Sequence, residues 1–304
     1  MIKESKYRGI FFMLLAALGF SIMGGAAKAL KESFNAGQLV FYRNAVGLLF
    51  LLPGLLIRPP VQEGGKPFRL AFRGLMGTIA LYTLLYCILH IPLGTAMSYN
   101  LTSALFIAIF SFFLFKEYHG NWVALAVILG FAGMLLIYKP VMHLPWYYHL
   151  AGLISGITSA IAYLTVHRLA KYYDPRVIVL SFLLSGFLVP LFTMIIHYTT
   201  GAQADGLFII DFKLPDGTDW FWILLMGLAA LFGQYFVTKS YGADKAGIVS
   251  IFGYSNIIYS VFIGMMLGDA FPDWISWAGI VCIILSGVII SLHKIKQTVP
   301  NSTN

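Results

Sequence analysis

Three basic side chains lie inside or beside the long apolar runs of this 304-residue chain, where a charge is costly and indicates function. Arg43 and Arg73 each lie about one or two helical turns inside a run, and Lys28 lies near the end of another. The guanidinium of arginine is a planar fork that suits carboxylate and phosphate groups. These residues therefore predict recognition of a negatively charged group. Snorkelling to the membrane surface, or binding of lipid phosphates, would explain the same positions.

Acidic residues are missing from the same regions. Glu117, Asp244 and Asp269 all fall at the ends of apolar runs, and no aspartate or glutamate lies well inside one. A pump for lipophilic cations is expected to carry a buried carboxylate, both as a counter-charge and as a proton carrier. The sequence therefore favours an anionic or zwitterionic cargo.

Uncharged polar side chains gather in the middle of four apolar runs. In a dry environment such groups need partners, which a cargo molecule, cavity water or a neighbouring helix could supply. Tyrosines among them could also stack on a planar cargo. We predict a substrate site formed by Arg43, Tyr82, Tyr86, Tyr99, Asn100, Ser103, Gln234, Tyr235, Tyr254, Ser255 and Asn256, with Arg43, Arg73 and Lys28 recognising charge.

The composition requires these residues to be positioned by membrane helices. Hydrophobic residues make up 59% of the chain and charged residues 11%, against about a quarter charged in soluble domains. Apolar runs of about 20 residues are long enough to cross a bilayer. We predict an all-α integral membrane protein with ten transmembrane helices, at 9–30, 37–57, 68–91, 94–115, 121–138, 149–169, 176–198, 220–240, 245–268 and 274–292.

The distribution of basic residues predicts the orientation. Most of the 20 lysines and arginines fall on one set of flanks, which the positive-inside rule assigns to the cytoplasm. Both termini are then cytoplasmic. The basic residues lie between the apolar runs and not in one patch, so the net charge of +8 does not indicate a nucleic-acid partner.

The second half of the chain repeats the first. At a constant offset of 152, Tyr82 corresponds to Gln234 and Ser103 to Ser255. We expect one five-helix repeat at 1–140 and a second at 141–304, inverted because each contains an odd number of spans. Inverted repeats place a substrate site between the halves near the bilayer midplane. Pro53 and Pro190 correspond separately, in the shorter second span of each half, and these matched helix prolines are candidate hinges, although membrane helices also simply tolerate proline.

Six short motifs are spread along nearly the whole chain: Tyr42-Arg43-Asn44, Phe72-Arg73-Gly74, Ile91-Pro92-Leu93-Gly94-Thr95-Ala96, Phe115-Lys116-Glu117, Ala243-Asp244-Lys245-Ala246 and Leu267-Gly268-Asp269. In this order and spacing they resemble the EamA-type ten-span members of the drug/metabolite transporter superfamily. The first span has Gly19-Phe20-Ser21 where many relatives carry Trp-Gly-Ser, which leaves the fold intact but indicates no particular subfamily. The resemblance implies a 5+5 inverted repeat, a central cavity and alternating-access movement of small organic metabolites.

These observations predict a secondary transporter of the bacterial inner membrane that exports or exchanges a small anionic or zwitterionic metabolite. Export of aromatic or nucleoside-like compounds or drugs is the alternative. An intramembrane enzyme is disfavoured, because no catalytic motif occurs. We predict no cofactor and no metal. The expected partners are the lipid bilayer and the cargo, with a proton or a counter-substrate as the coupling partner.

Overall fold

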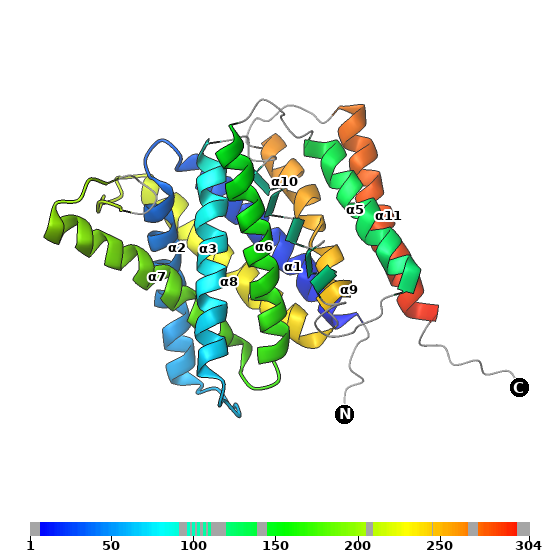
Figure 1. Ribbon diagram of the computed structural model, residues 1–304, viewed down its shortest axis with the longest axis horizontal. Coiled ribbons are helices and arrows are strands. Elements are labelled where there is room, and N and C mark those ends of the chain that lie inside the picture. Colours follow the sequence, from blue (N-terminus) through cyan, green and yellow to red (C-terminus); the bar gives the residue numbers. More distant parts are fainter. Residues whose placement is uncertain are drawn as a thin grey trace, which may run out of the picture.

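The computed structural model describes residues 7–90, 120–138, 145–204, 209–244, 246–266 and 273–296, and ten positions between 96 and 110 that are also helical. Every regular element within these residues is a helix (Figure 1). The helices are α1 (Arg8–Ala29), α2 (Ala36–Ile57), α3 (Pro67–His90), α5 (Gly120–Tyr138), α6 (Trp146–Leu169), α7 (Pro175–Thr200), α8 (Asp219–Ala243), α9 (Ala246–Phe252), α10 (Ser255–Met266) and α11 (Trp274–Lys296). Among them, α1, α2, α3, α6, α7 and α8 are long and apolar enough to cross a membrane.

Local sequence signals set the ends of α2 and α7. Asn35 and Gln38 form a capping box, in which each side chain accepts a hydrogen bond from the other residue's backbone N–H, at 2.9 and 3.0 Å. Asp174 caps α7 by accepting from the Arg176 N–H, and Pro175 occupies its first turn. Gly201 ends α7 with a φ of 68°, a left-handed conformation that favours glycine.

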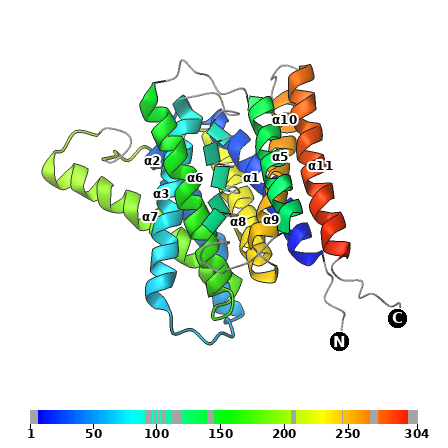
Figure 2. The same cartoon turned by 45° about the vertical axis from the view of Figure 1, so that its right-hand side comes forward.

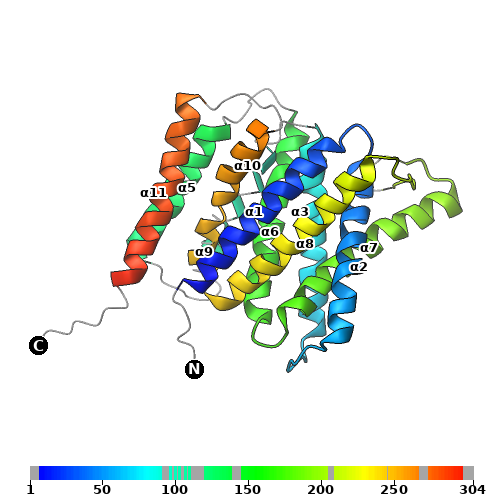
Figure 3. The ribbon, with the colours of Figure 1, turned by 180° about the vertical axis from the view of Figure 1, so that it is seen from behind.

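The helices pack in pairs that join distant parts of the chain. The most extensive contacts join α1 with α8, α5 with α11 and α3 with α6, followed by those of α7 with both α2 and α3. Figure 3 shows α1 running beside α8, and Figures 1 and 2 both show α5 and α11 side by side. Of the two halves predicted from the sequence, the first helix of each (α1 or α6) therefore packs against the third helix of the other (α8 or α3).

The helix predicted at 245–268 is interrupted within its described residues. It is divided into α9 and α10 by a turn at Gly253 and Tyr254. The backbone N–H groups of these two residues bond to carbonyls three residues earlier, those of Ser250 and Ile251, at 3.0 and 3.1 Å. Hydropathy does not report such a break, because the apolar run continues through it.

A loop contact at the α2 N-terminus joins the two halves of the chain. Gln38 Nε2 donates to the Asp211 carboxylate at 3.0 Å, and Lys213 Nζ donates to the Ser33 carbonyl at 2.7 Å. The Tyr42 hydroxyl donates to the Lys213 carbonyl. The segment between α7 and α8 is thereby held across the beginning of α2.

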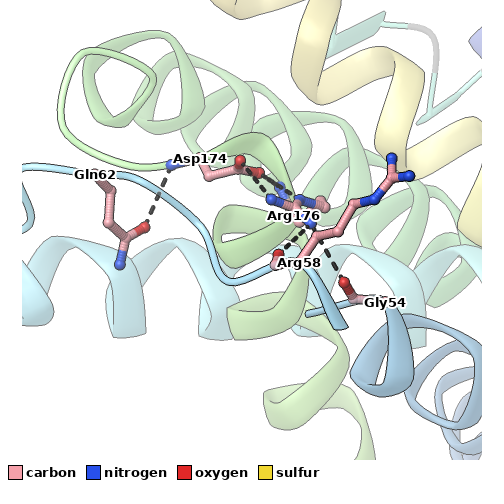
Figure 4. Close-up of polar contacts among 5 residues, drawn as sticks. All are labelled: Gly54, Arg58, Gln62, Asp174 and Arg176. Atoms are coloured by element: carbon pink, nitrogen blue, oxygen red, sulfur yellow. Dashed lines mark hydrogen bonds and ion pairs between the residues drawn. The ribbon is translucent and has the colours of Figure 1, made fainter. Parts of the chain in front are cut away.

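A second loop contact lies at the α2 C-terminus, at the opposite end of that helix (Figure 4). Arg176 Nη1 donates to the Arg58 carbonyl at 2.8 Å, and the Asp174 N–H donates to Gln62 Oε1 at 3.4 Å. Arg176 also forms an ion pair with Asp174, with Nε 3.0 Å from Oδ1. The segment between α2 and α3 is thereby held against the beginning of α7.

Asp174→Asn should weaken this second loop contact in a pH-dependent way. Burial would raise the pKa of the Asp174 carboxyl, but hydrogen bonds and charge from Arg176 outweigh it and hold the pKa below its usual range. A carboxyl whose pKa is lowered in the folded state stabilises the fold above pH about 4. This stabilisation is lost as the pH falls through the lowered pKa. At neutral pH the variant should lose at most about 1 kcal/mol, because the pair is partly exposed.

Asparagine retains an oxygen that can cap α7, so this substitution isolates the charge. Thermal unfolding in detergent from pH 7 to pH 3 measures the effect. The Tm difference between the wild type and the variant should shrink as the pH falls below about 4. A difference that stays constant across this range would show that the carboxylate charge plays no part.

Candidate functional site

A cavity of about 110 Å³ lies where α1, α2, α3, α6, α7, α8, α9 and α10 meet. That space accommodates several water molecules or a compact solute. Its walls combine apolar side chains with charged and polar ones. The charged and polar side chains are Arg43, Arg73, Asn100, Ser103, Ser159, Tyr163, Gln234, Tyr241, Ser250 and Asn256.

Arg43 of α2 and Arg73 of α3 are the charged side chains in the described part of this cavity wall. Their exposed fractions are 2% and 1%, so neither reaches solvent by snorkelling. The Cζ atoms of Arg43 and Arg73 lie 5.1 and 4.8 Å from the ring centroid of Phe182 on α7. Cation–π contacts of this kind hold both guanidiniums against the same ring.

The two arginines differ in how many of their donors are occupied. Arg43 Nη1 donates to Asn44 Oδ1 at 3.1 Å, and its Nε lies 3.4 Å from Met23 Sδ. Asn44 is itself fixed, because its Nδ2 donates to the Val40 carbonyl at 2.7 Å. Arg73 Nε and Nη1, in contrast, are buried without a hydrogen-bond partner among the described residues. Since buried polar groups are normally bonded, Arg73 presents donors that await an acceptor.

Hydrogen bonding also separates the polar side chains that hold helices together from those that remain available. Asn256 Nδ2 donates to the Ala17 carbonyl at 2.9 Å and joins α10 to α1. Asn100 Nδ2 lies 3.0 Å from Ser155 Oγ and 3.1 Å from Ser159 Oγ on α6. The side chain of Gln234 makes no hydrogen bond to the described part of the chain, although it is 4% exposed and lines the cavity. Gln234 is therefore available to a bound molecule, whereas these two asparagines mainly connect helices.

The cavity brings together about half of the predicted site residues. Lys28, half-buried in the last turn of α1, and Tyr82, Tyr86, Tyr99, Tyr235, Tyr254 and Ser255 are outside the lining set. The predicted residues that line the cavity are Arg43, Arg73, Asn100, Ser103, Gln234 and Asn256.

Several of the other predicted residues pack elsewhere. Tyr86 lies against His90 and Tyr148, with ring centroids 4.5 and 5.7 Å away. The Tyr99 hydroxyl bonds to His149 Nδ1. Tyr254 belongs to a separate apolar cluster that includes Ala126 of α5 and Ile280 of α11. Pro53 and Pro190 lie inside α2 and α7, as the sequence predicted.

The other lining residues were not predicted from the sequence, and they include Ser159, Tyr163, Phe182 and Tyr241. The Tyr163 and Tyr241 rings stack with centroids 5.0 Å apart and join α6 to α8. The α6 residues had a signal, because Ser155, Ser159 and Tyr163 recur every four residues and therefore share one helix face. Phe182 had none, since phenylalanine is common in every apolar run.

Comparisons with known proteins show which family this chain is similar to. The family model described as "EamA-like transporter family" matches residues 7–139 and 146–292. An uncharacterized transporter of Helicobacter pylori is 31% identical over 95% of this chain and 96% of its own length. The pseudopaline exporter CntI of Pseudomonas aeruginosa is 29% identical over 97% of this chain and 99% of its own length. A riboflavin transporter of Vibrio cholerae is 24% identical over 98% of this chain and 97% of its own length.

A solved crystal structure has the same fold. It superposes with a TM-score of 0.76 at 17% sequence identity and covers 97% of this chain and 100% of its own. At that identity the similarity concerns the fold alone.

Proposed function

The chain belongs to the EamA-like transporter family, and from this premise we propose that it is a secondary transporter of a small anionic or zwitterionic metabolite. It is a multi-pass membrane protein with six long apolar helices among its described residues. The family and the relatives named above are transporters and not enzymes. The proposed location is the bacterial inner membrane, and the proposed activity is export or exchange.

The observation that carries this proposal is the pair of buried arginines in the cavity. Arg43 and Arg73 are fully desolvated, and neither has an ion pair with a described residue. A buried charge without a partner is strongly unfavourable, so an occupant that brings negative charge is stabilised there. The free donors of Arg73 and the free amide of Gln234 would orient that occupant.

The proposed architecture is ten transmembrane helices in two inverted repeats, 1–140 and 141–304, with both termini in the cytoplasm. The two separate family matches support this division. The helix pairing supports it too, because exchange of the two halves converts the α1–α8 pair into the α6–α3 pair. Movement of one half against the other would expose the cavity to each side in turn.

Alternating access requires contacts that break on one side at a time. The loop contacts at the two ends of α2 suit this role, because each joins segments from both halves of the chain. Pro53 and Pro190 interrupt the backbone hydrogen bonding of α2 and α7, and we propose that these helices bend there. A proton or a counter-substrate would couple the movement to a gradient.

An aromatic cargo is the second candidate, and the aromatic residues of the cavity wall favour it. Phe182, Tyr163 and Tyr241 line the cavity, and the Tyr163 and Tyr241 rings stack on each other. These rings could stack on a planar body while the arginines bind its acidic group. An aromatic acid would therefore satisfy both candidates, whereas a neutral aromatic molecule or drug would use only the rings.

Uptake into proteoliposomes tests the proposal. The panel consists of labelled succinate, glutamate, uridine and the lipophilic cation tetraphenylphosphonium. We expect saturable uptake of an acid or a zwitterion, competed by unlabelled acids of the same class. Movement of the lipophilic cation alone, unaffected by Arg43→Ala, would contradict the anionic cargo. Flux that does not saturate would indicate a channel.

A further inference from the structure

We propose, on the basis of the function above, that the cargo is a dianion. A compact molecule with two acidic groups would neutralise Arg43 and Arg73 together. Three features of the cavity support a dianion: its charge, the position of its two guanidiniums and the number of donors that they leave free.

Among the described residues that line it, the cavity wall carries two positive charges and no negative one. Along the sequence, no acidic residue occurs between Glu63 and Glu117 or between Glu117 and Asp174. These intervals contain all of α3, α5 and α6. In a low-dielectric interior a single negative charge would leave one of the two arginines uncompensated. An occupant with two negative charges compensates both arginines.

The positions of the guanidiniums allow one small molecule to reach both. Their Cζ atoms lie 5.1 and 4.8 Å from the same Phe182 ring centroid. The distance between the two Cζ atoms therefore cannot exceed these two distances added together. Gly77 permits this arrangement, because a Cβ atom there would lie 2.7 Å from Phe182 Cδ2 and 3.3 Å from Arg73 Nη1. The phenylalanine ring covers part of both guanidiniums, so an occupant must bind at their remaining edges.

The free donors match more than one acidic group. Arg73 has two unpartnered donor atoms, Nε and Nη1, among the described residues. Arg43 uses Nε and Nη1 on Met23 and Asn44, which leaves Nη2 without a hydrogen bond to the described chain. Carboxylate groups accept such charge-assisted hydrogen bonds, two or more at a time. One carboxylate on Arg73 and a second near Arg43 would use these donors.

Matched acids that differ by one charge test the proposal. Succinate and glutarate are dianions at neutral pH, and their monoamides, succinamate and glutaramate, have nearly the same size with a single charge. Binding to the folded protein raises its Tm, so thermal unfolding in detergent gives apparent affinities. The wild type should bind each diacid at least about tenfold more tightly than its monoamide. A factor of about ten corresponds to the lower end of the free-energy range of a hydrogen bond to a charged group.

Single-arginine variants should lose this discrimination. In Arg73→Gln and in Arg43→Gln, we expect diacid and monoamide to bind with equal affinity, because one positive charge remains. Arg69→Gln is the matched control, since Arg69 lies one turn earlier on α3 and is exposed. It should retain the wild-type preference. Size-exclusion profiles and the Tm without acid verify that both single-arginine variants are folded.

The outcomes separate this inference from the proposed function. Equal affinity of the wild type for diacid and monoamide would overturn the dianion while an anionic cargo stands. A preference for the diacid over the monoamide that persists in both single-arginine variants would overturn the dianion as well, because other residues would then recognise the second charge. If no acid raised the Tm and no acid was transported in proteoliposomes, the anionic cargo itself would be wrong.

Discussion

Arg73→Gln is expected to lower the rate of cargo transport by about 100-fold at limiting cargo concentration, since a lost buried charge contact costs about 2–5 kcal/mol. Uptake into proteoliposomes measures this rate. The same substitution should leave the Tm of the empty protein unchanged or raise it. Two donor atoms of Arg73 have no partner in the described chain, and replacing an uncompensated buried charge by a neutral group removes its desolvation penalty.

Loss of transport without loss of stability distinguishes a binding residue from a structural one. Arg69→Gln changes the charge of α3 equally at an exposed position and should transport like the wild type. A large fall in the Tm of Arg73→Gln would assign Arg73 to the packing of the bundle. Wild-type transport by the variant would remove Arg73 from the site.

Gly19→Val should destabilise the protein by about 1–3 kcal/mol or more, the usual effect of overpacking a tight core. A Cβ atom at Gly19 of α1 would lie 2.9 Å from the Ala229 carbonyl oxygen and 2.9 Å from the Gly233 nitrogen of α8. Both are backbone atoms, which cannot rotate away as a flexible side chain could. The two helices would have to separate, and they carry Phe20 and Gln234 of the cavity wall.

Gly54→Val provides the control for this prediction. A Cβ atom at Gly54 of α2 would have no heavy atom within 4 Å, and the position is exposed. Its effect on Tm should therefore be small. Thermal unfolding in detergent compares the two variants. Equal losses at Gly19 and Gly54 would show that the valine side chain itself, and not the close approach of α1 and α8, is responsible.

The fold was largely predictable because lipid imposes a simple rule on sequence. A run such as 68–91 must satisfy its own backbone hydrogen bonds, and in the structure it is α3. The family match confirms the resemblance inferred from the motifs around Arg43 and Arg73. The break at Gly253 was not predicted, because its backbone bonds depend on local geometry that hydropathy does not record.

The site was only partly predictable, because periodicity gives the face of a helix but not its neighbour. Arg43, Arg73 and Gln234 could be found because a polar group inside an apolar run is costly wherever it lies. Tyr82 and Tyr86 are four residues apart and share one face of α3, yet neither lines the cavity. Which residues remain unpaired depends on the partners brought by other helices, as the contrast between Asn256 and Gln234 illustrates.

A structure determined with the transported anion bound would test the central claim most directly. We expect the acidic group of the cargo within hydrogen-bonding distance of Arg73 Nε and Nη1, with a second contact from Arg43 and the amide of Gln234 nearby. Cargo bound away from these residues, or Arg73 paired instead with a lipid phosphate, would contradict the claim that the two buried arginines recognise the cargo.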